Sequence, residues 1–518
     1  MKEERGVKII LFFLIFCITI LHAQKEDYQW LSGYSMGPIG YDTSWGFYFG
    51  TTLMNFNSNP VVVTFDSTYK MNFDETNTSF CDSNGNLLFY TNGIYIANSL
   101  NETIENGDSL NAGWAQYIYD PTIQQLGYRI PQGIYAIAAP GTTNKYILIH
   151  SLDDSIGPIP LINGRELLNT LLDMSANGGL GQVIYKNQVV IDDLISDEFA
   201  MVRHGNGRDW WALVQKRTTN CYYRVLIDGN GVHKLADSTC GGTTLPVGDY
   251  GIACFSPDGS KYVYMSDHGG LNIFDFDRCS GELSNPINLA LPIILDSGWV
   301  GKGVAISPNN RFLYVSLTYQ LYQFDLSASN IIGSIDTVGF YDGYEAPDGS
   351  LFNTAQSGPD GKIYISCGNA ETDYHVINNP DSEGFLCDFQ QHSIHLPSPS
   401  GGVPSFPNYR LGALSGSVCD TLTGLSEVVR AAKEVILKVY PNPTSDIVTV
   451  DYGYTDWSIT GVVTLEISNE LGQIVYKEEL PLYSGYQKLD VTKFAAGIYT
   501  AFIKRNEQAV AVEKFAKE

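Results

Sequence analysis

The residues best suited to chemistry surround His204. Arg203 and His204 open a glycine-rich turn that leads through Asp209 into Trp210 and Trp211. An imidazole acts as a general base when a carboxylate orients it and a nucleophile or substrate proton lies within hydrogen-bonding reach. Asp209 could orient the ring, but the local sequence contains no recognisable nucleophile. The pattern therefore favours a histidine bonded within a tight turn over a catalytic histidine.

Two adjacent carboxylate pairs suggest a second possible chemistry. Asp153 is followed by Asp154, and Asp192 is followed by Asp193. Consecutive side chains on a β-strand point to opposite faces, so neither pair could supply the acid and the base of one reaction. We therefore expect these four aspartates to be solvated loop residues.

The remaining candidates are expected to be structural. Trp210 and Trp211 would lie on opposite faces of a strand, so at most one could reach a ligand and core packing is expected. His392 and His395 are spaced unsuitably for one strand face, which disfavours a shared metal ion. The chain contains no GxSxG, HExxH, P-loop or CxxC motif. We predict no catalytic residues, no cofactor and no metal site.

These side chains are positioned by a repeated strand–turn–strand unit. Ser256–Gly259 (SPDG), Ser307–Asn310 (SPNN) and Gly358–Gly361 (GPDG) begin 51 residues apart. Proline at the second position and Gly or Asn at the fourth predict a type I turn between antiparallel strands. The following strands (KYVYM, RFLYV and KIYIS) are apolar or aromatic on both faces, as expected for a blade packed between neighbouring blades. Asp275 and Asp325 lie in register, 50 residues apart, and are expected to cap turns.

The repeat predicts a seven-bladed β-propeller over residues 24–415. Six turn-centred units can be counted along the chain. Outside them, Gly46–Phe56 and Pro60–Phe65 resemble strands without a preceding inner strand, and Gly402–Tyr409 resembles a lone inner strand. We therefore expect a closing blade shared by both ends, which would remove exposed sheet edges. Glu166–Met174 has apolar residues at helical spacing, but its place in the repeat predicts a strand.

Composition is typical of an extracellular all-β protein. The 518 residues include 51 Gly, 33 Tyr and 24 Phe, and only 17% are charged. The net charge of −25 disfavours nucleic acid and anionic membranes as partners. No apolar run beyond the N-terminus approaches the roughly 20 residues that a membrane-spanning helix needs, so no transmembrane segment is expected.

Residues 1–23 are predicted to be a secretory signal peptide. A basic start precedes the apolar segment Ile9–Leu21, and cleavage is expected between Ala23 and Gln24. Eight cysteines remain after this cleavage. Their even number permits disulfides in an oxidising compartment, and the sequence leaves the pairing open.

A second domain is expected over residues 437–518, after a linker of residues 416–436. Strand signals there recur at shorter spacing, and seven short strands with turn residues between them predict an immunoglobulin-like β-sandwich. The expected strands are Ile436–Tyr440, Ile447–Tyr452, Val462–Ser468, Ile474–Glu479, Lys488–Val491, Gly497–Lys504 and Ala509–Phe515.

The larger region resembles a family of secreted proteins from gliding and related Bacteroidetes-type bacteria. The resemblance rests on GNLLFYTNG (Gly85–Gly93), DMSANGGLG (Asp173–Gly181), RHGNGRDWWALV (Arg203–Val214) and PSFPNYRLGAL (Pro404–Leu414). It covers roughly residues 45–415 and implies a seven-bladed propeller with WD-like repeats. It implies no defined activity.

The tail resembles the type A C-terminal sorting domain of the type IX secretion system. The similar stretches are VYPNPTSD (Val439–Asp446), LEISNELGQIVY (Leu465–Tyr476), LDVTKFAAGIYTAFI (Leu489–Ile503) and the closing KFAKE (Lys514–Glu518). This resemblance implies recognition by the type IX translocon, removal by a sortase-like surface protease, and a final location that is secreted or on the outer-membrane surface, reached through the periplasm. The residues that carry the signal are expected to be Tyr440, Pro441, Asn442, Pro443, Gly472, Gly497, Tyr499 and Lys514.

Two functions remain open for the exported protein. It is either a surface-displayed binding or scaffold propeller for an extracellular glycan or protein, or a propeller-fold polysaccharide lyase or glycoside hydrolase. Propellers host both kinds of function, so the fold alone does not choose between them. The absence of a catalytic motif favours the binding protein.

Overall fold

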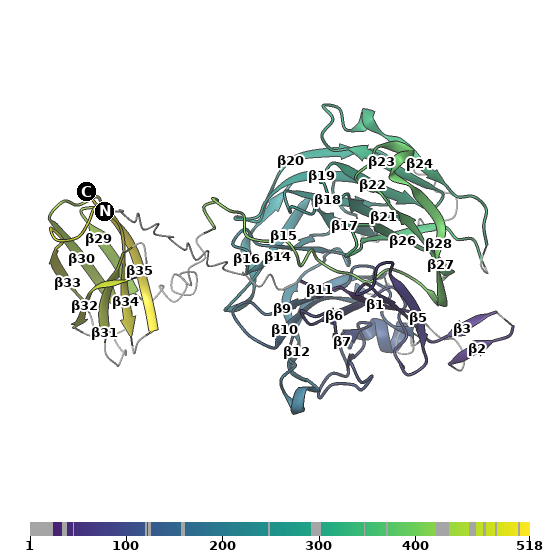
Figure 1. The fold of residues 1–518 in the computed structure, drawn as a ribbon, viewed down its shortest axis with the longest axis horizontal. Coiled ribbons are helices and arrows are strands. Elements are labelled where there is room, and N and C mark those ends of the chain that lie inside the picture. The colour runs from purple at the N-terminus through teal and green to yellow at the C-terminus, as the bar shows by residue number, and fades with distance from the viewer. Residues whose placement is uncertain are drawn as a thin grey trace, which may run out of the picture. The chain divides into compact units, whose positions relative to one another are not determined.

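The computed structural model is almost entirely β-structure (Figure 1). It describes residues 24–518 except 34–38, 45, 120–121, 123–125, 157–160, 247–248, 292–301, 346–347, 369–370, 421–434, 455–462, 470–472, 482–483 and 506–507. The predicted signal peptide and most of the predicted linker therefore lie outside the described residues. The few helical turns are the π-helix η1 (Ala115–Tyr119) and the 3-10 turns η2 (Asn177–Gly179), η3 (Ile332–Ser334) and η4 (Gly384–Cys387).

Of the six four-stranded sheets in the described part of the chain, five have their strands hydrogen-bonded in chain order, which is the arrangement of a propeller blade. The first is β9 (Ile134–Ala138), β10 (Lys145–Ile156), β11 (Leu161–Asp173) and β12 (Gln182–Asp192). The second is β13 (Ala200–Arg203), β14 (Trp210–Gln215), β15 (Cys221–Asp228) and β16 (Gly231–Cys240). The third is β17 (Gly251–Phe255), β18 (Lys261–Ser266), β19 (Gly270–Asp277) and β20 (Glu282–Leu289).

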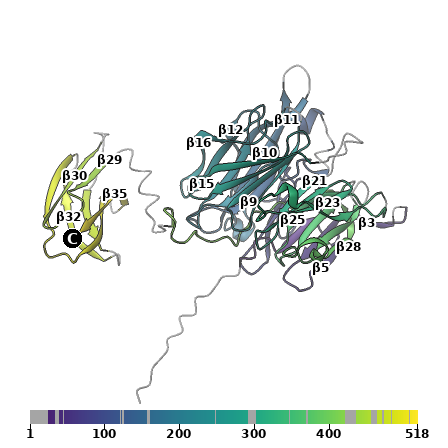
Figure 2. The ribbon, with the colours of Figure 1, turned by 90° about the horizontal axis from the view of Figure 1, so that it is seen from above.

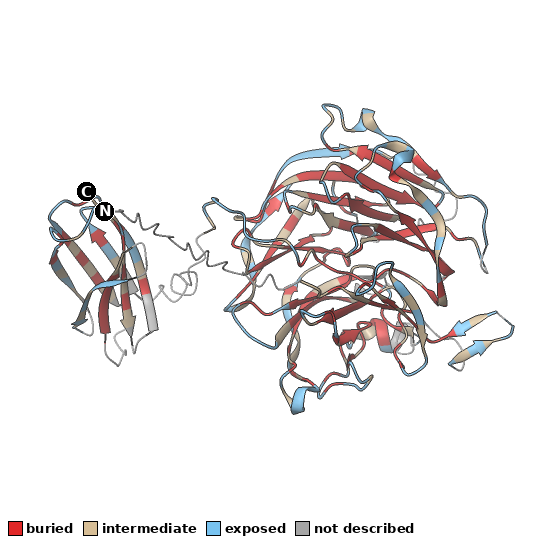
Figure 3. Cartoon of the chain, viewed as in Figure 1, coloured by how far each residue is buried: buried red, intermediate tan, exposed pale blue. Residues whose placement is uncertain are grey.

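The two later sheets repeat this order. They are β21 (Lys302–Ile306), β22 (Phe312–Leu317), β23 (Gln320–Asp325) and β24 (Asp336–Phe340), then β25 (Phe352–Ser357), β26 (Ile363–Cys367), β27 (Glu371–Ile377) and β28 (Phe389–Ser400). The second strand of a sheet is buried on both faces, as in β14, β22 and β26 (Figure 3). The sequence-based expectation of strands packed on both sides is confirmed.

The expected turns join β17 to β18, β21 to β22 and β25 to β26, the first two strands of their sheets. The fourth residue of each turn has a left-handed backbone: φ is 72° at Gly259, 63° at Asn310 and 80° at Gly361. Gly and Asn are the residues that adopt this conformation at least cost. In each turn the amide of the fourth residue donates to the carbonyl of the first, at 2.8 Å for Gly259 and for Asn310 and 3.1 Å for Gly361.

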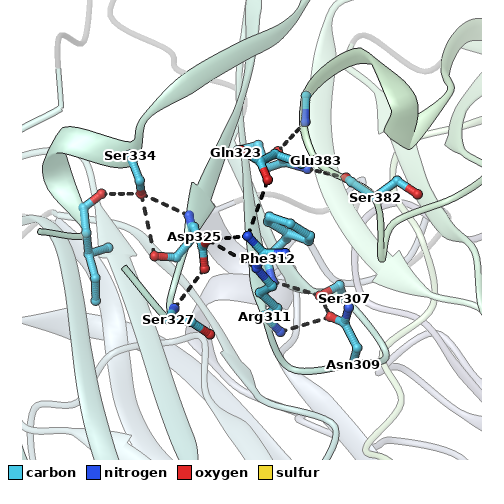
Figure 4. Close-up of polar contacts among 12 residues, drawn as sticks. Ser307, Asn309, Arg311, Phe312, Gln323, Asp325, Ser327, Ser334, Ser382 and Glu383 are labelled. Carbon is cyan, nitrogen blue, oxygen red and sulfur yellow. Dashed lines mark hydrogen bonds and ion pairs between the residues drawn. The ribbon is translucent and has the colours of Figure 1, made fainter. Parts of the chain in front are cut away.

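Figure 4 shows the polar network beside the Ser307–Asn310 turn. Asp325 accepts a hydrogen bond from the Ser327 amide at 2.9 Å, so it caps a turn as expected. It also pairs with the Arg311 guanidinium at 2.7 Å. The preceding repeat pairs Lys261 with Asp275 at 2.8 Å in the same way. The basic residue after each turn therefore ties the second strand to the third.

The strands before the first four-stranded sheet form smaller sheets. β1 (Gln29–Ser32), β4 (Thr51–Asn55) and β5 (Val62–Asp66) form one three-stranded sheet, and β6 (Thr78–Cys81), β7 (Leu87–Thr91) and β8 (Ile96–Asn98) form another. β2 (Gly40–Asp42) and β3 (Phe47–Phe49) form a hairpin.

The expected closing blade shared by both chain ends is wrong in its strand composition. Gln29–Ser32 is an outer strand in the order β1-β4-β5 of a three-stranded sheet, and Gly402–Tyr409 contains no regular strand. The 402–409 segment instead lies along β6, where the Ser405 amide donates to the Asn77 carbonyl at 2.8 Å. Two prolines, Pro404 and Pro407, remove amide donors that a strand in this segment would need.

The two ends of the repeat region nevertheless meet in the first of two compact units, which comprises residues 1–136, 176–183 and 295–410. Ser398 of β28 donates through its hydroxyl to the Gly50 carbonyl at 2.7 Å. The Trp30 ring packs against Tyr364, with 5.3 Å between ring centroids. Four sheets are thus neighbours here, in the order β21–β24, β25–β28, β1-β4-β5 and β6–β8.

The second unit holds the three sheets β9–β12, β13–β16 and β17–β20 as neighbours. Figure 2 shows its long strands β10 and β11 from above. β11 includes Glu166–Asp173, so the strand predicted against the helical pattern is confirmed. Two disulfides lie in this unit, Cys221–Cys240 and Cys279–Cys419. Cys81, Cys254, Cys367 and Cys387 are free thiols.

The C-terminal region is a β-sandwich, and all seven of its predicted strands are confirmed. One sheet is β29 (Val435–Tyr440), β30 (Ile447–Tyr454) and β33 (Ser484–Asp490). The other contains β32 (Ile474–Leu480), β31 (Val463–Ser468), β34 (Gly497–Arg505) and β35 (Gln508–Lys517). Side chains from both sheets form one hydrophobic core that includes Val450, Leu465 and Ile503.

Candidate functional site

The predicted sorting motif lies at the end of β29 and is bound to the C-terminal strand β35. Asn442 stands between Pro441 and Pro443, and its side-chain amide donates to the Lys514 carbonyl at 2.9 Å. The Asn442 Oδ1 oxygen accepts from the Ala516 amide, also at 2.9 Å. The Asn442 side chain thus donates one hydrogen bond to β35 and accepts another from it, because a side-chain amide carries both a donor and an acceptor.

Thr444 extends the same connection. Its amide donates to the Ala516 carbonyl at 2.9 Å, and its carbonyl accepts from the Glu518 amide at 3.0 Å. Thr444 is 3% exposed although neighbouring motif residues are exposed. Backbone and side-chain hydrogen bonds from Asn442 and Thr444 therefore hold the motif against the last residues of the chain.

The other predicted signal residues are distributed over the sandwich. Tyr499 is buried, stacks on Phe515 at 5.6 Å between centroids and donates to the Ala495 carbonyl at 2.8 Å. Gly497 begins β34, and Tyr440 ends β29 with 49% of its surface exposed. Gly472 and Ala23 lie outside the described residues, and Gln24 is the first residue described.

An Asn442→Ala substitution is expected to loosen the C-terminal strand. It removes two hydrogen bonds, each worth about 0.5–1.5 kcal/mol, so the Ala516 amide should exchange with solvent at least about tenfold faster. Hydrogen exchange of the full chain measures this rate. Lys488→Ala, an exposed change on β33, is the control and should leave it unchanged. Equal exchange in both variants would contradict the proposed connection.

His204 is confirmed as a histidine bonded within its turn. Its Nδ1 accepts from the Asn206 amide at 3.0 Å, and its Nε2 lies 3.1 Å from the Cys279 carbonyl oxygen. Burial lowers the pKa of His204, which keeps the ring neutral. The Asp209 carboxylate is bound by Asn206 and Arg208, whereas both imidazole nitrogens contact the backbone, so Asp209 does not orient His204 as a catalytic pair would require.

Trp210 and Trp211 are core residues, as expected, with 2% and 3% of their surfaces exposed. His392 and His395 contact different carboxylates, Asp342 at 2.8 Å and Asp373 at 3.2 Å. Among the described residues, no group of three or more His, Cys, Asp and Glu side chains is arranged to hold a metal ion.

The expectation for the adjacent aspartates is wrong at Asp153. Its side chain lies against the buried carboxylate of Asp197, and burial together with Asp197 raises the Asp153 pKa well above its ordinary value. Asp192 and Asp193 do form surface ion pairs, with Arg165 at 2.9 Å and Lys216 at 2.8 Å. Asp153 and Asp154 lie within β10, which continues through Ile156, and Asp192 ends β12, so the expected loop position is wrong for these three residues.

Arg217 compensates the buried charge of this carboxyl cluster (Asp153, Asp197 and Glu198). Its side chain is completely buried and contacts Asp197 at 3.2 Å. The guanidinium also donates to the carbonyls of Ile195 at 2.8 Å and Asp249 at 2.5 Å. Because Arg217 stabilises the ionised Asp197, we assign the retained proton to Asp153. Arg217 thus joins the segments that precede β13 and β17.

The structure also places one thiol beside one imidazole. Cys367 Sγ lies 3.2 Å from His375 Nε2, the pairing used by cysteine nucleophiles. Both residues are completely buried, burial raises the Cys367 pKa well above its ordinary value, and burial lowers the His375 pKa to about 4. The pair is therefore a neutral thiol and a neutral imidazole that no substrate can reach, instead of an activated nucleophile.

Glu371 is a second buried acid. Its Oε1 accepts from the Asp348 amide at 3.0 Å, whereas its Oε2 has no hydrogen-bond partner within the described part of the chain. Burial raises the Glu371 pKa to about 8. Neither this residue nor Arg217 was recognised from the sequence. The one feature of the sequence that could have indicated their burial is the position of each charged residue next to an apolar strand.

The C-terminal geometry agrees with a known family. Residues 438–518 match the model of the secretion system C-terminal sorting domain. The chain is therefore exported by the type IX secretion system to the cell surface or the extracellular space, and its sorting domain implies interaction with that machinery. Within the described residues, no helix combines the length and the hydrophobicity required to cross a bilayer. No curated protein sequence matches the chain.

Several solved structures are weakly similar to this chain. One is a functionally unknown protein from Desulfotomaculum acetoxidans, at 12% identity over 68% of this chain and 96% of that chain, with a TM-score of 0.35. A second is PorZ, described as an essential surface component of the type IX secretion system of Porphyromonas gingivalis, at 11% identity over 90% and 63% of the chains and a TM-score of 0.31. A third is a putative 6-phosphogluconolactonase from Bacteroides fragilis, at 9% identity over 72% and 99%, also with a TM-score of 0.31. Similarities this weak carry no functional argument.

Proposed function

We propose that this protein is a seven-bladed β-propeller that binds a ligand outside the cell without catalysing a reaction on it. The observation that carries the proposal is the match of residues 438–518 to a sorting domain, because it places the remaining chain outside the cell. In this proposal the protein comes from a Bacteroidetes-type bacterium. A sortase-like surface protease removes the sorting domain near residues 416–436.

The blade count is supported by the sheets of the two units. Four sheets are neighbours in the first unit and three are neighbours in the second, and the five complete ones share one strand order. In the proposal these seven sheets close into one ring, which leaves no sheet edge exposed. The contact of β28 with the β1-β4-β5 sheet supports the join between the last blade and the first.

A polysaccharide lyase or glycoside hydrolase is the second candidate function. It is favoured by carboxyl groups whose pKa values are raised, since a general acid needs such a group. However, Asp153 lies against the Asp197 carboxylate, which pairs with Arg217, and Glu371 accepts a hydrogen bond from the Asp348 amide, so both acids are already engaged in contacts within the protein. The binding function is therefore the better supported of the two.

Turnover assays test this choice. The purified full chain is incubated with neutral and acidic polysaccharides, and new reducing ends and unsaturated products are measured. The proposal predicts no product above a heat-treated sample. Circular dichroism checks that the Asp197→Asn and His204→Ala variants are folded. Turnover by the wild type that is lost in either folded variant would show that the protein is an enzyme and would overturn the proposed binding function.

A further inference from the structure

A cavity in the first unit has the features of a ligand site. Its volume is ≈ 470 Å³, within the range of about 300–1,000 Å³ that is usual for small-molecule pockets. All of its lining residues come from one short stretch of chain, between Lys70 and Tyr117. The lining includes the polar or aromatic side chains of Lys70, Tyr95, Glu102, Asp108, Gln116 and Tyr117.

The backbone around this cavity is unusual in two respects. The wall that carries Gln116 and Tyr117 is the π-helix η1, a form that is rare and frequent at functional sites. The facing loop has left-handed backbone at Ser109, with φ 56°, and at Asn101, with φ 65°. Such conformations are retained when the surrounding structure fixes them, and here the Asn101 side chain is fixed by Thr68 at 2.8 Å.

Gln116 supplies the observation that points to a ligand. It is 2% exposed and lines the cavity. Within the residues that the structure describes, its Oε1 oxygen has no hydrogen-bond donor. A buried acceptor without a donor is costly, and native structures normally provide one. The Oε1 atom is covered in this structure, and a ligand hydroxyl in the cavity would satisfy it once the Gln116 side chain turns this atom toward the cavity.

The other lining groups restrict the chemistry of that ligand. Tyr117 exposes 47% of its surface, and Tyr95 is a half-buried residue of the same lining. Aromatic faces carry partial negative charge and attract the polarised C–H bonds of a sugar ring. Glu102 and Asp108 can accept hydrogen bonds from hydroxyl groups, and Lys70 can donate one. Two carboxylates against one ammonium disfavour an anionic ligand.

We propose that this cavity binds a neutral oligosaccharide, with Tyr117 stacking on a sugar ring and Gln116 Oε1 accepting a hydroxyl hydrogen bond. This inference rests on the proposed binding function and gives it a ligand class and a position. It concerns residues 70–117 alone, far along the chain from the buried acids that would serve an enzyme. Failure of the site would therefore leave the exported binding protein intact.

Titration calorimetry of the full chain tests the site. The probes are maltohexaose, cellohexaose and mannohexaose, with hexagalacturonate as the anionic comparator. Ribonuclease B, which carries a mannose-rich glycan, and ribonuclease A, which lacks it, distinguish a protein-borne glycan from a free polysaccharide. Binding of at least one neutral oligosaccharide or of ribonuclease B alone is expected. Binding of hexagalacturonate only, or of no probe, would overturn the proposal.

Substitutions locate the binding. Tyr117→Ala and Gln116→Leu should each weaken it by about tenfold, whereas Tyr117→Phe should retain it because the ring remains. Tyr319→Ala is the matched control, since Tyr319 is also 47% exposed and lies in the same unit. Thermal unfolding checks that each variant is folded. Unchanged affinity in both Tyr117→Ala and Gln116→Leu would overturn the proposed site, even if a neutral oligosaccharide binds elsewhere on the protein. The turnover assay would still decide separately whether the protein is an enzyme.

Discussion

The Arg217→Ala variant is expected to lose about 3–5 kcal/mol of unfolding free energy, because it leaves the buried carboxylate of Asp197 without its counter-charge. The substitution also removes the donors that hold the Ile195 and Asp249 carbonyls, so the segments before β13 and β17 lose their common anchor. Urea unfolding of the full chain, followed by tryptophan fluorescence, measures the effect. Trp210 and Trp211 lie in the β13–β16 sheet and report on this unit.

Arg165→Ala is the matched control for this experiment. Arg165 also pairs with an aspartate in the same unit, Asp192 at 2.9 Å, but the two side chains are 39% and 64% exposed. Exposed pairs contribute about 0–1 kcal/mol, so the control should change the unfolding midpoint little. Equal losses in the two variants would mean that burial of Arg217 does not decide its contribution.

Glu371 should make the free energy of unfolding fall as pH rises from 4.5 to about 8. Its folded-state pKa of about 8 lies above the ordinary value of 4.5, so the folded protein retains a proton that the unfolded chain releases. The stabilisation is complete below pH 4.5 and is lost as pH rises through about 8. One such group gives a slope of at most about 1.4 kcal/mol per pH unit within this window.

The Glu371→Gln variant imitates the protonated acid and should remove this slope. Relative to wild type it should gain stability between pH 5 and pH 8, which denaturant unfolding at several pH values within the window measures. Glu282→Gln is the control, because the Glu282 side chain is 63% exposed. The attribution to Glu371 fails if wild type and the Glu371→Gln variant depend on pH equally.

The features that the sequence predicted are those set by local chemistry. Each turn at Ser256, Ser307 and Gly358 forms as expected because proline and a left-handed Gly or Asn specify it without help from the rest of the fold. The seven tail strands are confirmed for the same reason, since alternating apolar residues and turn signals are local. The 166–174 segment shows the limit of local patterns, because its helical spacing is overridden by pairing with β10.

The features that the sequence did not predict depend on contacts distant along the chain. β1 pairs with β4 and not with the 402–409 segment, which no local pattern could decide. Asp153 is buried by residues more than 40 positions later, Asp197 and Arg217, so its sequence neighbours suggested a loop. The cavity beside η1 requires a π-helix and left-handed residues in the facing loop, neither of which has a clear sequence signature.

Secretion of a truncated chain shows whether residues 437–518 carry the export signal. The full chain and a chain that ends at Ile436 are expressed in the native host, and each is quantified in the periplasm and outside the cell. The truncation keeps Cys419 and its disulfide to Cys279, so the repeat region retains this link. A reporter fused to residues 437–518 provides the converse arm. If residues 437–518 are the export signal, the truncated chain stays in the periplasm and the reporter leaves the cell. Normal appearance of the truncated chain outside the cell would contradict this role of the sorting domain.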